Sequence, residues 1–356
     1  MNIIRIPKIT IVFLSFFFLL SWVNLLSAAE SKRVFIVASY EKEHVCGWPQ
    51  ETGVMKGLSK DGWFEGMNLE VGRYYMDTKR KNTSPELIKK EASLALAAIA
   101  SFKPAVVVVL DDNAFREVAL PLVEREDIQI VFSGMNGQPE TYNREKHFMV
   151  SRQRPGGNVT GVYEKLYASR SMKVLAAALP DFNGKKIVGI TDFSPTGNAV
   201  TRQFELEIVD RPAQIGWELK RVRNWQEYTD LIKRLNDDDE VLAIYPVALS
   251  LNVSDSLTYS APEIFKWTIE NSKKPEMALN YFFSEIGLFG GAAVDFQSMG
   301  FVAGRYAGRI LNGATAGELA IVDAPYYAIV FNQGRARKLG IDIPTPLLTA
   351  ADHIYQ

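Results

Sequence analysis

The sequence predicts an α/β protein built as two doubly wound lobes, each a mostly parallel sheet covered by helices. Three observations lead to this fold class. Short β-branched runs alternate with helical segments. This alternation occurs in two successive regions of about 120 residues each. A chain of 356 residues also has room for about two domains. A hydrophobic content of 47% excludes a disordered chain, and a single cysteine excludes a disulfide scaffold.

The first region begins with a β-branched, aromatic run that suits a buried strand. A helix is predicted where Ser84 can cap the first turn and Pro85 suits the first helical position. The run AVVVVL at 105–110 is continuously apolar, as in a strand covered on both faces. The predicted strands are 33–39, 71–78, 105–110 and 128–133, and the predicted helices are 85–102 and 113–125.

The second region repeats this pattern without repeating the residues. Its helix that contains Trp225 and Tyr228 carries an aromatic stripe at helical spacing, which we interpret as core packing. Right-handed crossovers place the strand ends of each lobe on one edge of its sheet. The predicted strands are 186–192, 217–222, 241–246 and 277–282, and the other predicted helices are 198–209 and 262–271.

The N-terminus has the order of residues found in a secretory signal. Arg5 and Lys8 precede an apolar run at 9–26, and Ser27-Ala28-Ala29 supplies small residues before Glu30. We predict that residues 1–29 are a signal peptide cleaved after Ala29, which directs the protein to the periplasm. The alternative is an uncleaved anchor, because an apolar stretch of this length can just span a bilayer.

Charge and composition exclude several classes of partner. The 40 basic and 41 acidic residues leave a net charge of -1, so nucleic acid is not expected as a partner. His44, His147 and His353 lie far apart and Cys46 is alone, so no metal site is expected. No phosphate-binding loop, dinucleotide-binding turn or catalytic motif is present, and we expect neither a cofactor nor catalytic residues.

Polar and aromatic residues follow the predicted strands, where open α/β sheets bind their ligands. Two facing lobes would bring these strand ends together as a cleft with aromatic walls and a few polar groups. The alternative is that such residues only form turns and helix caps. The predicted ligand-binding residues are Ser39, Tyr40, Trp48, Asp111, Asp112, Asn113, Ser133, Asn136, Phe193, Thr196, Asn198, Tyr245 and Asp295.

Two blocks of sequence resemble a known family. They are PGGNVTGV at 155–162 and IVFNQGRARKLG at 329–340, the latter followed by residues 343–344 and 347–352; the similarity extends over 130–134 and 290–311. Together they resemble the ABC transporter substrate-binding family, in the branch with a type I periplasmic-binding fold that includes tryptophan/tyrosine-type binding proteins. The resemblance covers nearly all of the mature chain.

The resemblance implies two lobes joined by crossing segments, one of them near 158–162, and a permease of an ABC transporter in the inner membrane as partner. Lobe 1 is expected at 31–155 plus 287–313, and lobe 2 at 163–283 plus 320–356. The chain departs from the family pattern at 111–113, where many relatives have small residues, and at 136–139, where many have Asp-Pro. The ligands of better-known members are therefore not carried over.

The residue types favour an amino acid or a similar zwitterion as ligand. Asp111 or Asp112 could pair with an ammonium group, hydroxyls and helix N-termini could hold a carboxylate, and Tyr40 could contact an apolar group. We therefore predict an exported, monomeric solute-binding protein of an ABC importer. The alternatives are a ligand-sensing partner of a signalling receptor or sensor kinase, and an enzyme that uses the cleft, with Cys46 as nucleophile and His44 as base.

Overall fold

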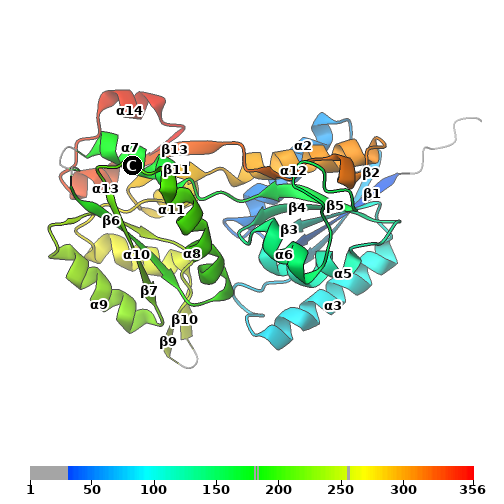
Figure 1. Ribbon diagram of the computed structural model, residues 1–356, viewed down its shortest axis with the longest axis horizontal. Helices are drawn as coiled ribbons and strands as arrows, with labels where there is room; N and C mark the ends of the chain where they lie inside the picture. The colour runs from blue at the N-terminus through cyan, green and yellow to red at the C-terminus, as the bar shows by residue number, and fades with distance from the viewer. Residues whose placement is uncertain (1–30, 180–181, 183, 255–256) are drawn as a thin grey trace, which may run out of the picture.

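The computed structural model describes residues 31–179, 182, 184–254 and 257–356, which form two lobes side by side (Figure 1). The predicted signal peptide, residues 1–29, lies outside the described residues. No helix in the described part of the chain combines the length and the apolar character needed to cross a membrane.

The first lobe is built on a six-stranded sheet with the order β12-β5-β4-β3-β1-β2, in which all neighbours are parallel. Its strands are β1 (Lys32–Ala38), β2 (Leu69–Tyr75), β3 (Val106–Leu110), β4 (Gln129–Met135), β5 (Val159–Tyr163) and β12 (Val322–Asp323). Its helices are α2 (Gly47–Lys60), α3 (Pro85–Phe102), α4 (Asp112–Ala114), a π-helical turn (Phe115–Ala119), α5 (Leu120–Leu122), α6 (Pro139–Glu145), α12 (Phe296–Leu311) and a 3-10 turn (Ala316–Glu318).

The second lobe has the strand orders β7-β6-β8 and β11-β13-β14, linked by bridges from Ile244 to Glu276 and from Met277 to Gly290. Its strands are β6 (Lys186–Asp192), β7 (Gly216–Val222), β8 (Val241–Pro246), β9 (Leu251–Ser254), β10 (Leu257–Tyr259), β11 (Gly290–Val294), β13 (Tyr327–Asn332) and β14 (His353–Tyr355). Its helices are α7 (Ala168–Ala178), α8 (Pro195–Glu207), a 3-10 turn (Ile208–Asp210), α9 (Trp225–Asn236), α10 (Ala261–Asn271), α11 (Tyr281–Ile286), α13 (Gln333–Lys338) and α14 (Thr345–Ala350).

The α/β fold class is confirmed, and several elements lie where the sequence placed them. Helix α3 has the predicted bounds, and its first turn is capped by Ser84, whose Oγ accepts a hydrogen bond from the backbone N–H of Leu87 at 3.3 Å. All five residues of β3 are buried, as expected for a strand covered on both faces. The aromatic stripe of α9 packs in the core, where Tyr228 is fully buried.

Other elements differ from the prediction. The expected helix at 113–125 is divided into α4, a π-helical turn and α5, and it ends near Pro121, which lacks a backbone donor. The expected strand at 277–282 forms only isolated bridges, because α11 begins at Tyr281. Helix α2 was not predicted, because Gly47, Gly53 and Gly57 give it a low helix propensity.

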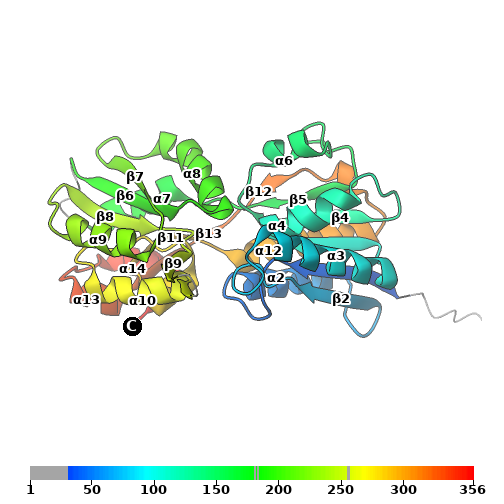
Figure 2. The ribbon, with the colours of Figure 1, turned by 90° about the horizontal axis from the view of Figure 1, so that it is seen from below.

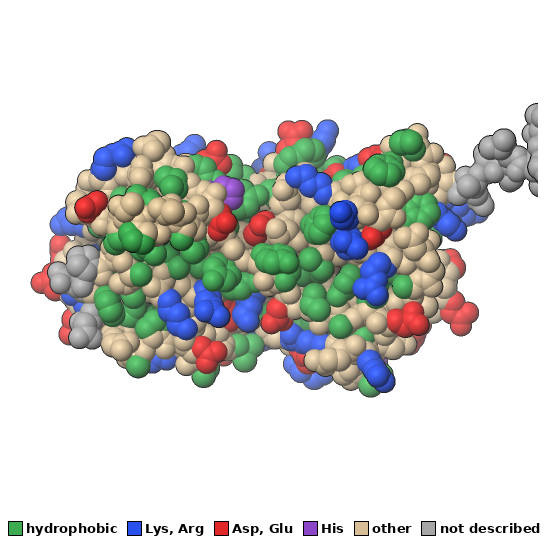
Figure 3. Space-filling model, turned by 90° about the horizontal axis from the view of Figure 1, so that it is seen from above, with side chains coloured by type: hydrophobic (Ala, Val, Ile, Leu, Met, Phe, Trp, Pro, Cys, Tyr) green, Lys and Arg blue, Asp and Glu red, His purple; other side chains and the backbone are tan. Residues whose placement is uncertain are grey.

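Three connections pass between the lobes: from β5 to α7, from β11 to α12 and from β12 to β13 (Figure 2). The Tyr167 hydroxyl in the first connection donates a hydrogen bond to the carbonyl of Ala324 in the third. Seen from above, hydrophobic side chains gather over the middle of the molecule, where the lobes meet (Figure 3).

Strand pairing departs from the expected lobe boundaries at two places. Strand β11 pairs with β13 of the second lobe, although the sequence placed all of 287–313 in lobe 1. Strand β12 pairs with β5 of the first lobe, although the sequence placed 320–356 in lobe 2. The chain crosses between the lobes after β11 and after β12, and the sequence pattern does not mark these points. The expected division of the chain into lobes therefore stays a proposal.

Candidate functional site

A cavity of about 310 Å³ lies between the lobes, at the carboxyl ends of the first-lobe strands. The first lobe contributes most of its charged groups, and the second lobe contributes an apolar wall with four hydroxyls. It is lined by Tyr40, Glu41, Glu43, His44, Val45, Cys46, Lys79, Arg80, Asp111, Asn136, Glu164, Ser194, Thr196, Val200, Val247, Ala248, Leu249, Ser250, Ser260, Ala261, Pro262, Leu279, Phe283 and Phe296.

The loop between β1 and α2 forms one side of the cavity. Tyr40 donates a hydrogen bond to Asp111 Oδ2 at 2.7 Å, and its ring stacks on that of His44 with 4.4 Å between the centroids. Burial, and then the charge of Asp111, raise the pKa of Tyr40 well above its usual value, so this phenol stays protonated. Burial also raises the pKa of the Cys46 thiol, which opposes a nucleophilic role for it.

A lysine links the two lobes across the cavity. Lys79 Nζ lies 3.0 Å from Asp111 Oδ1 in the first lobe and donates to Thr196 Oγ1 of α8 at 3.4 Å. Burial alone lowers the pKa of Lys79, but the charges of Asp111 and Asp112 outweigh it, and the net pKa is raised. The lysine is therefore charged, and its charge is balanced by that of Asp111.

Glu164 follows β5, at the start of the first connection between the lobes, and is 2% exposed. Its Oε2 accepts a long hydrogen bond of 3.4 Å from Asn136 Nδ2. Burial raises its pKa well above the usual value, and Asp111 and Asp112 raise it further. In the part of the chain that the structure describes, no cation forms an ion pair with Glu164.

Asp112 has a different role from Asp111. Its carboxylate accepts hydrogen bonds from the backbone N–H groups of Asn136 and Gly137, at 3.0 and 2.8 Å, and from the Tyr142 hydroxyl at 2.7 Å. Burial, then Asp111, raise its pKa despite these bonds. Asp112 thus orders the loop after β4.

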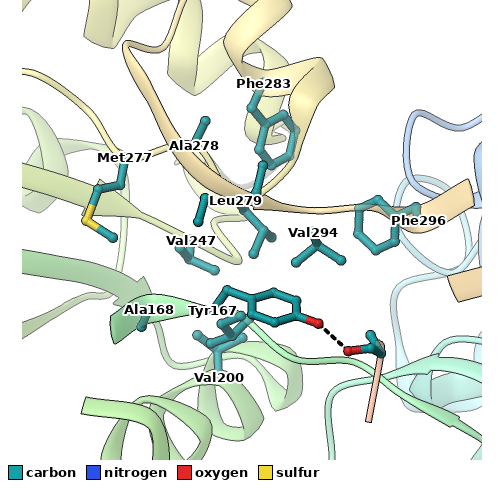
Figure 4. Close-up of a cluster of buried hydrophobic side chains, with 14 of the residues drawn as sticks. Tyr167, Ala168, Val200, Val247, Met277, Ala278, Leu279, Phe283, Val294 and Phe296 are labelled. Atoms are coloured by element: carbon teal, nitrogen blue, oxygen red, sulfur yellow. Dashed lines mark hydrogen bonds between the residues drawn. The ribbon is translucent and has the colours of Figure 1, made fainter. Parts of the chain in front are cut away.

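The second lobe supplies the apolar wall. Val200, Val247, Leu279 and Phe283 of the second lobe gather around the connections between the lobes, together with Phe296 at the start of α12 (Figure 4). Phe283 and Leu279 are largely buried, at 5% and 9% exposure. This wall can contact the apolar part of a small organic molecule.

The predicted site residues fall into three groups. Tyr40, Asp111, Asn136 and Thr196 line the interlobe cavity. Asp112, Asn113 and Asn198 line a separate groove of about 220 Å³ between the lobes, which Thr196 also borders. The ligand-binding role of these seven residues stays a prediction. The remaining six, which line neither space, are Ser39, Trp48, Ser133, Phe193, Tyr245 and Asp295.

Each of these six residues has another environment. Ser39 Oγ accepts from the Ala114 N–H, and Ser133 Oγ donates to Gln50 Oε1, both inside the first lobe. Tyr245 is fully buried in the second lobe. Asp295 caps α12, Trp48 is 48% exposed, and Phe193 is 46% exposed beneath the guanidinium of Arg221.

Several cavity residues were missed in the sequence, chiefly Lys79 and Glu164. Glu164 comes one residue after β5, so the same rule of polar residues at strand ends could have found it. Lys79 lies in the loop after β2 and reaches the cavity through its long side chain, which the sequence pattern does not reveal.

Comparison with known proteins gives a family and a fold. The model of the family described as ABC transporter substrate binding protein matches residues 127–355, well over half of the chain. No curated protein sequence matches the chain. Members of this family are non-catalytic solute-binding proteins, and such a protein implies a transporter as partner.

Solved structures with the same fold cover 91% of this chain. An ABC domain in complex with L-Trp from Streptococcus pneumonia is 17% identical over 100% of its own length, with a TM-score of 0.70. A conserved domain protein from Vibrio cholerae is 19% identical over 100% of its length, with a TM-score of 0.69. A substrate binding protein with adhesive properties from Clostridium difficile, in a ligand-free, open structure, is 19% identical over 99% of its length, with a TM-score of 0.65.

These structures show the fold, and the family match covers most of the second lobe together with β4, β5 and α12 of the first. The protein that these findings describe is a two-lobed, non-catalytic binding protein with a cavity between its lobes. The chain belongs to the ABC transporter substrate-binding protein family.

Proposed function

We propose that this protein captures an amino acid or a related small zwitterion in the interlobe cavity and delivers it to an ABC permease in the inner membrane. The proposal places the protein in the periplasm, after cleavage of the signal peptide following Ala29. The observation that carries it is the division of the cavity, with charged groups on the first lobe and an apolar wall on the second.

The division of the cavity suits a molecule with polar and apolar ends. Asp111, Glu164 and Lys79 offer groups of both signs within one space. Hydroxyls of Ser194 and Ser260 lie at the starts of α8 and α10, where backbone N–H groups favour a carboxylate. A neutral hydrocarbon would leave these groups desolvated without a partner, which is unfavourable.

The ligand is tested by calorimetric titration of the mature protein against a panel of amino acids. We expect binding of one molecule per chain to the wild type. Thr196→Trp, which fills the cavity from the first turn of α8, should abolish binding. The matched control is Glu205→Trp, an exposed position on the same helix, which should bind as the wild type does. No heat at millimolar concentration with any amino acid would contradict the proposal.

Transport and export are tested separately. N-terminal sequencing of the protein recovered from the periplasm should begin at Glu30. Deleting the gene should abolish uptake of the ligand by cells, and restoring it should recover uptake, whereas restoring Thr196→Trp should not. Unchanged uptake in the deletion strain would contradict the role in transport.

A further inference from the structure

The charges that line the interlobe cavity do not balance. Lys79 is paired with Asp111 at 3.0 Å, and Arg80 is paired with Asp77 at 3.2 Å. The other carboxylates of the cavity are Glu41, Glu43 and Glu164, and none of them forms an ion pair with a residue that the structure describes. The cavity therefore has more carboxyl groups than cations, which favours a ligand with a positive group.

Two carboxylates near the cavity already have partners in the protein. Asp111 accepts from Tyr40 and pairs with Lys79. Asp112 accepts three hydrogen bonds, two of them from the backbone after β4. An ammonium group at either residue would have to displace these partners. The sequence instead favours pairing of the ammonium group with Asp111 or Asp112, and that pairing stays a prediction.

Glu164 is the carboxylate with unused capacity. It is 2% exposed, yet it lines the cavity. Among the described residues, the one side chain that donates a hydrogen bond to it is Asn136, at 3.4 Å. A buried carboxylate without a cation is costly, so proteins keep such a group charged only where a partner supplies the missing positive charge. Glu41 adds to the need for a positive group in the cavity, because its Oε2 is buried without a hydrogen-bond partner in the described structure.

We infer that Glu164 binds a positively charged nitrogen of the ligand, so that the ligand is an organic ammonium compound whose apolar body lies against the second lobe. This inference rests on the proposed function, because it assigns the ligand class to the same cavity. The apolar body faces Val200, Leu279 and Phe283 (Figure 4). A carboxylate on the ligand is compatible with the cavity but is not required by Glu164.

Proton release gives this inference a second readout. Burial raises the pKa of Glu164, as do the charges of Asp111, Asp112 and Glu207, whereas Lys79 lowers it. A ligand cation beside Glu164 lowers that pKa, so binding near the pKa of the free protein releases a proton. Affinity should therefore rise with pH until Glu164 is ionised before the ligand arrives.

Three probes that share one apolar body separate the charges: phenethylamine as the cation, L-phenylalanine as the zwitterion and 3-phenylpropionate as the anion. Each is titrated by calorimetry into the wild type and Glu164→Gln, in two buffers with different enthalpies of ionisation. We expect the cation or the zwitterion to bind the wild type with proton release, and the anion not to bind. Glu164→Gln should bind about tenfold more weakly or worse and release no proton.

The matched control is Asp323→Asn, which removes an exposed carboxylate from another connection between the lobes without touching the cavity. It should bind as the wild type does, and circular dichroism and melting curves establish that all variants fold. A probe that binds Glu164→Gln as tightly as the wild type, or binding of the anion alone, would overturn the inference.

Native mass spectrometry distinguishes the two proposals. If the purified protein carries a small molecule without a positively charged nitrogen, the inference about Glu164 fails and the binding function stands. If it carries no small molecule and none of the three probes gives heat, both fail. A co-purified amine or amino acid that Glu164→Gln no longer retains supports both.

Discussion

Lys79 Nζ lies 3.0 Å from Asp111 Oδ1, and the same ammonium group donates to Thr196 Oγ1 of the second lobe at 3.4 Å. One side chain thus neutralises a buried acid of the first lobe and contacts the second. The Asp111 side chain is 2% exposed and that of Lys79 is 24% exposed, so solvent screens this pair only partly.

We predict that Lys79→Met destabilises the protein by about 2 kcal/mol, because it leaves the charge of Asp111 buried without its cation. Urea unfolding at pH 7 measures the loss. The double variant Lys79→Met/Asp111→Asn should recover part of it, since neither charge of the pair remains. The prediction fails if Lys79→Met alone is as stable as the wild type.

Glu164 should make stability depend on pH in the opposite sense to an ordinary ion-paired acid. Its pKa is raised in the folded protein, so the folded state binds more protons than the unfolded state above the usual carboxyl pKa. Stability contributed by this group therefore falls as the pH rises from the usual carboxyl pKa toward the folded pKa. Glu164→Gln removes the titrating group and therefore removes this loss of stability.

We accordingly expect the ligand-free Glu164→Gln variant to melt about 2 °C or more above the wild type at pH 7.5 and close to it at pH 4. Differential scanning calorimetry at several pH values measures the difference. Glu126→Gln, at an exposed position outside the cavity, is the control and should not change the melting temperature. A Glu164→Gln variant that is less stable at pH 7.5 would show that its charge is compensated in the free protein.

A second contact between the lobes involves Gln203 of α8. Its Oε1 accepts a hydrogen bond from Gln138 Nε2 at 2.6 Å and another from the Tyr163 hydroxyl. Gln138 and Tyr163 both belong to the first lobe, so these bonds form only when the lobes are close. They should favour the closed arrangement over an open one.

Gln203→Ala should therefore shift the ligand-free protein toward more open forms. We expect a larger radius of gyration by solution X-ray scattering and an affinity about threefold to tenfold weaker, because fewer molecules are in the binding-competent state. Glu205→Ala, an exposed position on the same helix, controls for changes in helix propensity. Unchanged scattering with unchanged affinity would mean that the Gln203 contacts do not influence closure.

The elements that the sequence predicted well are those whose signal is local. Helix α3 has both a capping serine and a proline at its first position, and β3 has a continuous apolar run. Helix α2 lacks such a signal. Its glycines lower helix propensity, and what stabilises it is contact with α12, which lies more than 200 residues later in the chain.

The site could be predicted only in part for a similar reason. The strand-end rule directed attention to the loops after β1, β3 and β4, where Tyr40, Asp111 and Asn136 line the cavity. It could not show that Tyr245, at the end of β8, points into the core and donates to the Leu166 carbonyl. Side-chain direction depends on the helices that cover each strand end, and those contacts are not local.

The close approach of α2 and α12 gives the last prediction. A Cβ atom on Gly304 would lie 2.1 Å from the Val54 carbonyl oxygen, which is backbone and cannot move aside. Gly304→Ala should therefore separate the helices and cost about 3 kcal/mol in the free energy of unfolding.

Gly62→Ala is the comparison. Gly62 has a φ of +90° but no atom near its Cβ position, so only backbone strain of about 1 kcal/mol is expected. Equal losses in the two variants by urea unfolding would show that α2 and α12 tolerate a wider spacing, and that Gly304 is not required for their packing.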